Sequence, residues 1–433
     1  MHDKQRKWNK GFIGGLILVT LALTALGGSQ IPGVQSRLIW RVERAAAFAR
    51  GIIDPVRPLP TPVGIVNENA LPLPPTPTLT TTPAPLSPTA APTLAVTPTP
   101  AAILPTPAPS FTPTSLPPRV ALTPPEYEMQ DINNCGPATL AMFLRYYGWE
   151  GDQFDISDVI KPVREDRNVN IEEMIYYLRN RAGGFESEFR VGGDITLLRR
   201  LVAAGFPVMV EESMKMDEPF WPNDDLWAGH YLLITGYDDA LQAFTVQDSF
   251  RGANRKITYS DLDHAWQAFN RVYLMIYPPA SRPQIQEILG RQWDVEQNRQ
   301  HALAVAEQET RADPTDSFAW FNLGTNLVYF EKYQDAAKAY DTASSLGLPQ
   351  RMLRYQFGPF FAYLHTGRMD DLLAIADYAL KRTPNAEEAW LWKGWALYRQ
   401  GDRLKAMEAF QKALEAHPGY QDAQYALNFV QNH

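Results

Sequence analysis

The stretch "MQDINNCGPATLAMFLRYYG", from Met129 to Gly148, contains Cys135, the only cysteine in the 433-residue chain. Pro137 suits the first turn of a helix, because the N–H that proline lacks has no helical partner there. Gly148 is the kind of residue that ends a helix. We therefore predict a helix from Pro137 to about Tyr147. Its apolar residues on nearly every side indicate that it is buried in a domain core.

Cys135 is thus expected at the N-terminus of this helix. The positive end of the helix dipole and the free N–H groups there lower a thiol's pKa and favour the nucleophilic thiolate. A single cysteine excludes an internal disulfide and a Cys-rich zinc site. The alternative role, a small buried hydrophobe, is common for a free cysteine but fits the middle of a helix better than its first turn. We interpret Cys135 as a nucleophile.

A thiolate nucleophile needs a base, and His230 is the better of two histidines in this part of the chain. His230 opens the apolar run "HYLLITGY", and Asp248 closes the next run, "AFTVQD". A hairpin centred on Asp239 would place His230 directly opposite Asp248, where a carboxylate can hold the imidazole tautomer. A slip of one residue would put them on opposite faces. His264 is expected on the polar face of a helix, without a role.

Gln130 precedes the cysteine by five residues and is a candidate donor to an oxyanion, together with the N–H of Cys135. The chain resembles the papain superfamily of cysteine peptidases, in the branch of the bacteriocin-leader (double-glycine) peptidases. The residues that carry the resemblance are Gln130, Cys135–Ala138, Tyr146–Gly148, Gly229–His230, Gly236–Tyr237 and Asp248. The resemblance implies that Cys135 is the nucleophile, His230 the general base, Asp248 its orienting partner and Gln130 the oxyanion donor. Ser249 stands where the family often has proline.

The C-terminal part contains an internal repeat. Aligning Trp320 with Trp390 brings Gly324 onto Gly394 and Tyr340 onto Phe410. The two tryptophans are two repeat lengths apart, and half of their separation in sequence is close to the period of tetratricopeptide repeats. The sequence resembles these repeats. We expect about three repeats, forming an all-α solenoid that binds a protein partner.

The N-terminal part has a different composition. The run from Gly11 to Gly28 has no charged residue and follows four basic residues, Lys4, Arg6, Lys7 and Lys10. Its length favours an uncleaved transmembrane helix over a cleaved signal. From about Asp54 to Pro125 the chain is rich in Pro and Thr, which predicts a disordered, extended stalk. The part beyond the membrane is then expected to be extracytoplasmic, or secreted if the segment is cleaved.

The expected fold class is an α+β papain-like domain followed by an all-α repeat solenoid. The net charge of -8 argues against a nucleic-acid partner. The expected divisions are residues 1–30 as cytoplasmic tip and anchor, 31–125 as juxtamembrane segment and linker, 126–280 as peptidase domain, and 285–433 as repeat domain.

The expected function is hydrolysis of peptide bonds in a peptide or protein substrate, without metal or cofactor. The alternatives are a thiol acyltransferase or transpeptidase, a cell-wall peptide amidase, and a non-catalytic peptide-binding scaffold.

Overall fold

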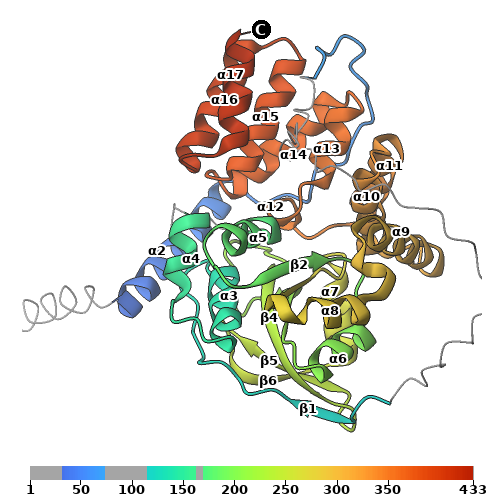
Figure 1. Ribbon diagram of the computed structural model, residues 1–433. Coiled ribbons are helices and arrows are strands. Elements are labelled where there is room, and N and C mark those ends of the chain that lie inside the picture. Colours follow the sequence, from blue (N-terminus) through green and yellow to red (C-terminus); the bar gives the residue numbers. More distant parts are fainter. Residues whose placement is uncertain (1–31, 74–114, 162–168, 433) are drawn as a thin grey trace, which may run out of the picture.

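The computed structural model describes residues 32–73, 115–161 and 169–432. Two parts of the chain are visible in Figure 1. Residues 119–277, the sheet region, hold a β-sheet with helices on both faces. Residues 295–432, the helical region, form a stack of antiparallel helices above it. This arrangement agrees with the expected α+β domain followed by helical repeats.

The sheet has seven strands in the order β2-β7-β3-β4-β5-β6, with β1 paired to β4. Every pairing is antiparallel. The strands are β1 (Arg119–Ala121), β2 (Glu186–Arg190), β3 (Val208–Lys215), β4 (Trp227–Asp238), β5 (Ala243–Asp248), β6 (Gly252–Thr258) and β7 (Tyr273–Tyr277).

Alternate residues of the central strands enter two different cores, as the period of two in a strand requires. Met209 and Leu233 pack with the helices α3, α4 and α5 on one face. Val210 and Leu232 pack with α6, α7 and α8 on the other. The helices are α3 (Cys135–Tyr146), α4 (Gln153–Ile160), α5 (Ile171–Asn180), α6 (Ile195–Ala203), α7 (Tyr259–Gln267) and α8 (Arg282–Leu289).

The helical region consists of paired helices. They are α9 (Val295–Ala312), α10 (Ser317–Tyr329), α11 (Tyr333–Leu346), α12 (Met352–Tyr355), α13 (Gly358–His365), α14 (Met369–Arg382), α15 (Glu387–Arg399), α16 (Arg403–Ala416) and α17 (Gln421–Asn432). Short 3-10 turns at Pro279–Ser281 and Gly290–Trp293 connect it to the sheet region.

The hairpins α10–α11 and α15–α16 use the same packing at equivalent positions. The indole Nε1 of Trp320 donates to the carbonyl of Pro314 at 3.0 Å, and that of Trp390 to Pro384 at 2.8 Å. Gly394 lets its helix approach the ring of Phe410, just as Gly324 approaches Tyr340. The alignment made from the sequence therefore pairs structurally equivalent residues.

The N-terminal part begins with α2 (Pro32–Ile53), and residues 54–73 then run along the helical region. This differs from the expected free stalk, since leucines of this segment pack against the repeats. Residues 74–114 and the expected anchor, 11–28, lie outside the described residues. Within the described part of the chain, no helix is long and apolar enough to cross a membrane.

The sheet region and the helical region share a polar interface. Arg351 forms a two-pronged ion pair with Asp224 at 2.5 and 2.7 Å. Asn322 donates to the carbonyl of Gln267, and Trp221 donates to the side chain of Gln350. The loop before β4 is therefore held by the helical region.

Candidate active site

Cys135 lies at the N-terminus of α3 as expected, although the helix begins at Cys135 itself and not at Pro137. Asn134 precedes the helix without capping it through its side chain, so the first N–H groups of α3 remain available near the sulfur. The hydroxyl of Thr139 donates to the carbonyl of Tyr231 at 3.2 Å and holds α3 against β4. This contact brings the start of α3 beside the strand that carries His230.

His230 and Asp248 come together from the adjacent strands β4 and β5. Nε2 of His230 lies 2.9 Å from Oδ1 of Asp248. The expected direct pairing was wrong, because Asp248 pairs with Leu232 in the ladder. The turn lies later in the chain than expected, and a bulge between Ile234 and Gly236 reverses part of the resulting shift. Because the resulting offset at Asp248 is even, both side chains remain on one face and meet diagonally.

The carboxylate of Asp248 is fixed by the loop that follows it. Its Oδ1 accepts N–H groups from Phe250 and Arg251, each at 2.9 Å. Burial acts to raise the pKa of Asp248, but the hydrogen bond and charge of His230 together with these N–H groups hold it below its ordinary value. Asp248 is therefore ionised and suited to hold one tautomer of the imidazole.

The thiol of Cys135 is half-buried and lies beside His230. Burial acts to raise the thiol's pKa, but the hydrogen bond and charge of His230, with N–H groups of Tyr231 and Gly136, lower it overall. For His230, burial acts to lower the pKa, but the hydrogen bonds to Asp248 and Cys135 raise it overall. The two shifts together favour a thiolate–imidazolium pair.

The position of Nε2 at Asp248 leaves Nδ1 as the ring nitrogen that serves Cys135. A strand histidine with a carboxylate on one nitrogen and a thiol on the other can hold a proton at a defined place. That is the arrangement required of a base next to a nucleophile.

Gln130 lies beside the same end of β5. Its N–H donates to the carbonyl of Ser249 at 2.9 Å, and the hydroxyl of Ser249 donates to Oε1 of Gln130 at 3.0 Å. The side-chain oxygen of Gln130 therefore faces Ser249, and the N–H donors on its Nε2 point to the other side. From the sequence, Ser249 was only a departure from the family pattern. Its contact with Gln130 could not be predicted, because the two residues are far apart in the chain.

The loop between Gln130 and Cys135 is held by residues that the sequence did not indicate. The side-chain oxygen of buried Gln153 accepts from the N–H of Asp131 at 2.7 Å and from Asn134 Nδ2 at 2.9 Å. Lys161 Nζ donates to two carbonyl groups of this loop. No local pattern distinguishes Gln153 from a helix surface residue, so only the tertiary contact identifies it.

Two buried acidic residues on β3 lie opposite the active strand. Glu212 pairs with His230 and Glu211 with Tyr231. Burial raises the pKa of Glu212 to about 7, partly offset by the charge of His230. Burial also raises the pKa of Glu211 well above its ordinary value. A protonated Glu211 adds no negative charge near the thiolate. The sequence analysis missed both residues.

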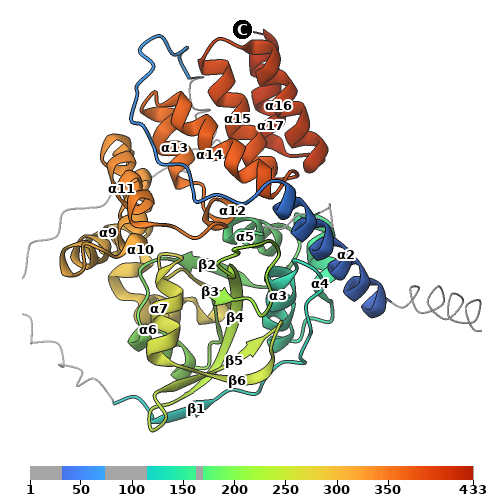
Figure 2. The same ribbon diagram turned by 180° about the vertical axis from the view of Figure 1, so that it is seen from behind.

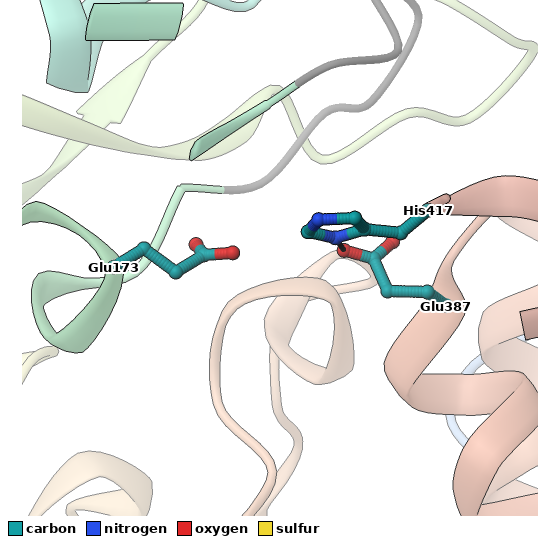
Figure 3. Close-up of side chains that lie close together, drawn as sticks. All are labelled: Glu173, Glu387 and His417. Carbon is teal, nitrogen blue, oxygen red and sulfur yellow. Dashed lines mark hydrogen bonds and ion pairs between the residues drawn. The ribbon is translucent and has the colours of Figure 1, made fainter. Parts of the chain in front are cut away.

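One further cluster contains metal-type ligands. Glu173 on α5 faces Glu387 and His417 of the helical region, with their ligand atoms all within 4.8 Å of one another (Figure 3). Nδ1 of His417 lies 3.3 Å from Glu387. Glu173 already accepts the N–H of Asn170 in the cap of α5. We interpret the cluster as a polar contact between the two regions, and it lies outside the site around Cys135.

Residues 121–277 match the Peptidase_C39 like family, and residues 387–420 match the tetratricopeptide repeat. The sheet region is thus similar to C39 peptidases, and the helical region includes a stretch similar to the tetratricopeptide repeat. This confirms the resemblance inferred from the sequence. The sheet region is from here on the C39-like region, and the helical region is the repeat region. The roles of the four site residues and the domain boundaries stay predictions.

Individual relatives are distant. Protein O-mannosyl-transferase TMTC3 of Homo sapiens is 26% identical over 156 residues, which is 33% of this chain and 17% of that relative's length. A C39-like peptidase from Bacillus anthracis has a similar structure, with 16% identity and a TM-score of 0.30, covering 37% of this chain and 97% of its own. The protein MamA has 16% identity and a TM-score of 0.29, covering 32% of this chain and 79% of its own.

Proposed function

We propose that this protein is a cysteine peptidase that uses Cys135, His230, Asp248 and Gln130. The observation that carries the proposal is that His230, hydrogen-bonded to Asp248, lies beside Cys135 at the N-terminus of a buried helix. A structural cysteine needs no such partner. The match to a peptidase family over the same residues supports it.

The chemistry follows from the contacts. The Cys135 thiolate attacks the carbonyl carbon of a peptide bond and forms a tetrahedral intermediate. Its oxyanion accepts hydrogen bonds from the N–H of Cys135 and the side-chain amide of Gln130. Nδ1–H of His230 gives its proton to the departing amine as the C–N bond breaks, leaving a thioester. Water, deprotonated by Nδ1, then attacks the thioester and releases the acid.

The repeats and the N-terminal segment set the context of this activity. The repeats support a role in binding a protein partner. The uncharged run from Gly11 to Gly28, preceded by basic residues, supports a membrane anchor with the peptidase held outside the cytoplasm. Protease added to intact cells should then cut the chain beyond the anchor, and a chain that stays whole until the cells are lysed would contradict this topology.

A peptide-library digest tests the proposal. The wild-type chain should cut a subset of peptides, and Cys135→Ala should cut none. Both proteins are checked by circular dichroism. A folded wild-type chain that cuts nothing, with Cys135 unreactive toward a mild thiol electrophile, would support the non-catalytic scaffold instead. Digestion with an added amine separates a transferase from a hydrolase by the ratio of products, because a transferase should place most of the acyl group on the amine and a hydrolase should release mainly the acid.

A further inference from the structure

The repeat region already holds a peptide, and that peptide is part of the same chain. Residues 54–73 leave the end of α2, where Asp54 pairs with Lys381 on α14, and continue without helix or strand along the repeats (Figures 1 and 2). Leu59, Leu71 and Leu73 pack against the hydrophobic core of the repeats. The segment is therefore bound on the repeats along its length.

Most of the polar contacts are made to the main chain of the segment. The N–H of Asn67 donates to the carbonyl of Gly367, and that of Leu71 to the carbonyl of Arg399, both at 2.8 Å. The hydroxyl of Tyr378 donates to the carbonyl of Arg57 at 3.0 Å. Main-chain contacts combined with apolar anchors are how grooves recognise extended peptides.

Asp371 on α14 is the most specific of these contacts. Its two carboxylate oxygens accept the N–H groups of Val63 at 2.7 Å and of Gly64 at 3.0 Å. Gly64 has φ +74, a backbone conformation that strongly favours glycine and turns the chain directly after these two N–H groups. Asp371 is 3% exposed, and Arg368 is its charge partner. A buried carboxylate needs such donors, so the pair of N–H groups completes this site.

The proline pattern of the segment fits this mode of binding. The sequence "PVRPLPTPVG" has a proline at positions 55, 58, 60 and 62. The N–H groups that the repeats bind come from non-proline residues after this run. Proline holds the free peptide in an extended form, so less conformational entropy is lost when it binds.

We propose that the surface of α14, with the ends of α13 and α15, is a binding site for an extended proline-rich peptide that is followed by a glycine turn. Residues 54–73 fill it in cis. A foreign peptide of the same chemistry engages the repeats only by competing with this segment. The inference does not depend on peptidase activity.

A binding experiment tests the competition. Every chain is full length and carries Cys135→Ala, so that the probe is not cut. The probe is a fluorescent peptide with the sequence of residues 55–73. In one variant the order of the amino acids in residues 54–73 is shuffled, which gives the permuted chain. The probe should bind the permuted chain at least about tenfold more tightly than the intact chain, because in the intact chain the tethered segment competes with the probe at a high effective concentration. Asp371→Asn in the permuted chain should weaken binding by about tenfold. Asp370→Asn, its exposed neighbour on α14, should leave binding unchanged.

Hydrogen exchange provides a second measurement that does not need the permuted chain. In the intact chain the amides of Val63, Gly64, Asn67 and Leu71 should be protected, and Asp371→Asn should remove the protection of the first two. Circular dichroism confirms the fold of each variant. Equal affinity of the probe for intact and permuted chains, no binding to a folded permuted chain, or unprotected amides in the intact chain would each overturn the proposal.

Discussion

The imidazole of His230 has a carboxylate on one side and a thiol on the other, and this predicts how reactivity depends on pH. The thiol's pKa is lowered, so reactivity appears as pH rises through a value below the ordinary one of about 8.5. The pKa of His230 is raised, so the ion pair is lost only as pH rises through a value above about 6.5. Cys135 should therefore react with iodoacetamide at about pH 6, whereas His230→Ala should react only near pH 8–9.

The control for this measurement is simple, because Cys135 is the only cysteine. Cys135→Ala gives the blank. His264→Ala, which removes an exposed histidine of α7, should keep the wild-type profile. If His230→Ala also keeps it, the thiol is not activated by the imidazole.

Asp248→Asn tests the orienting role of the carboxylate. Asparagine has nearly the same shape but loses the charge that favours the imidazolium, so kcat/KM should fall by about ten- to a thousandfold without loss of fold. The alkaline limb of the profile should also move to lower pH, because Asp248 raises the pKa of His230. The matched control is Asp238→Asn at the far end of β4, which faces Arg119 and should stay fully active.

Loss of the oxyanion donor should cost about as much as Asp248→Asn and less than His230→Ala or Cys135→Ala. Gln130→Ala should lower kcat/KM by about a hundredfold. The side-chain amide is replaced while the N–H contact to Ser249 remains, so the fold should be kept. Kinetics on one peptide substrate, with circular dichroism of each variant, measure the order. A fully active Gln130→Ala would exclude this residue as the donor.

The proximity of Cys135, His230 and Asp248 could be predicted because each has a local signal. Gly136 and Pro137 mark the helix start, one apolar run begins at His230, and the next ends at Asp248. The contacts of Ser249 and Gln153 had no such signal, because they depend on segments that approach only in the folded chain.

The β4–β5 hairpin shows what a strand pattern can and cannot predict. A hairpin centred on Asp239 put His230 and Asp248 directly opposite each other and therefore on the same face. The exact partner depends on where the turn begins and on the bulge after Ile234. Neither is visible as a glycine-type turn signal in "DDALQ". The predicted contact between His230 and Asp248 is still formed, because the register differs from the expected one by an even number of residues at Asp248.

The hairpin α15–α16 depends on close packing at Gly394. A Cβ at this position would lie 2.4 Å from the ring of Phe410, so one of the two helices must move. Gly394→Ala should therefore destabilise the protein by about 1–3 kcal/mol, although alanine is the better helix former. Urea unfolding followed by circular dichroism measures this. Gly183→Ala is the control, because an added Cβ there meets nothing within 4 Å. Equal stability of the two variants would contradict the role of Gly394.

The chain as a whole joins its parts more tightly than its sequence suggests. Composition separates a proline-rich segment, a C39-like region and repeats, and each was expected to stand apart. In the structure, residues 54–73 pack on the repeats, and the loop before β4 packs on α12. The first contact uses scattered leucines and main-chain N–H groups, and the second uses the side chain of Arg351, so neither carries a periodic signal. Sequence patterns therefore predict the regions but not how they join.

Arg351 and Asp224 provide the sharpest test of this junction, because their side chains are only 3% and 0% exposed. Removing one partner leaves the other charge buried and unpaired, so Arg351→Met should lower the free energy of unfolding by about 3–5 kcal/mol. Lys393→Met removes an exposed ion pair with Asp377 and should cost less than about 1 kcal/mol. The double variant Arg351→Met with Asp224→Leu should recover part of the loss, since no unpaired charge remains. Urea unfolding measures all three. If Arg351→Met costs no more than Lys393→Met, the two regions are not held together by this ion pair.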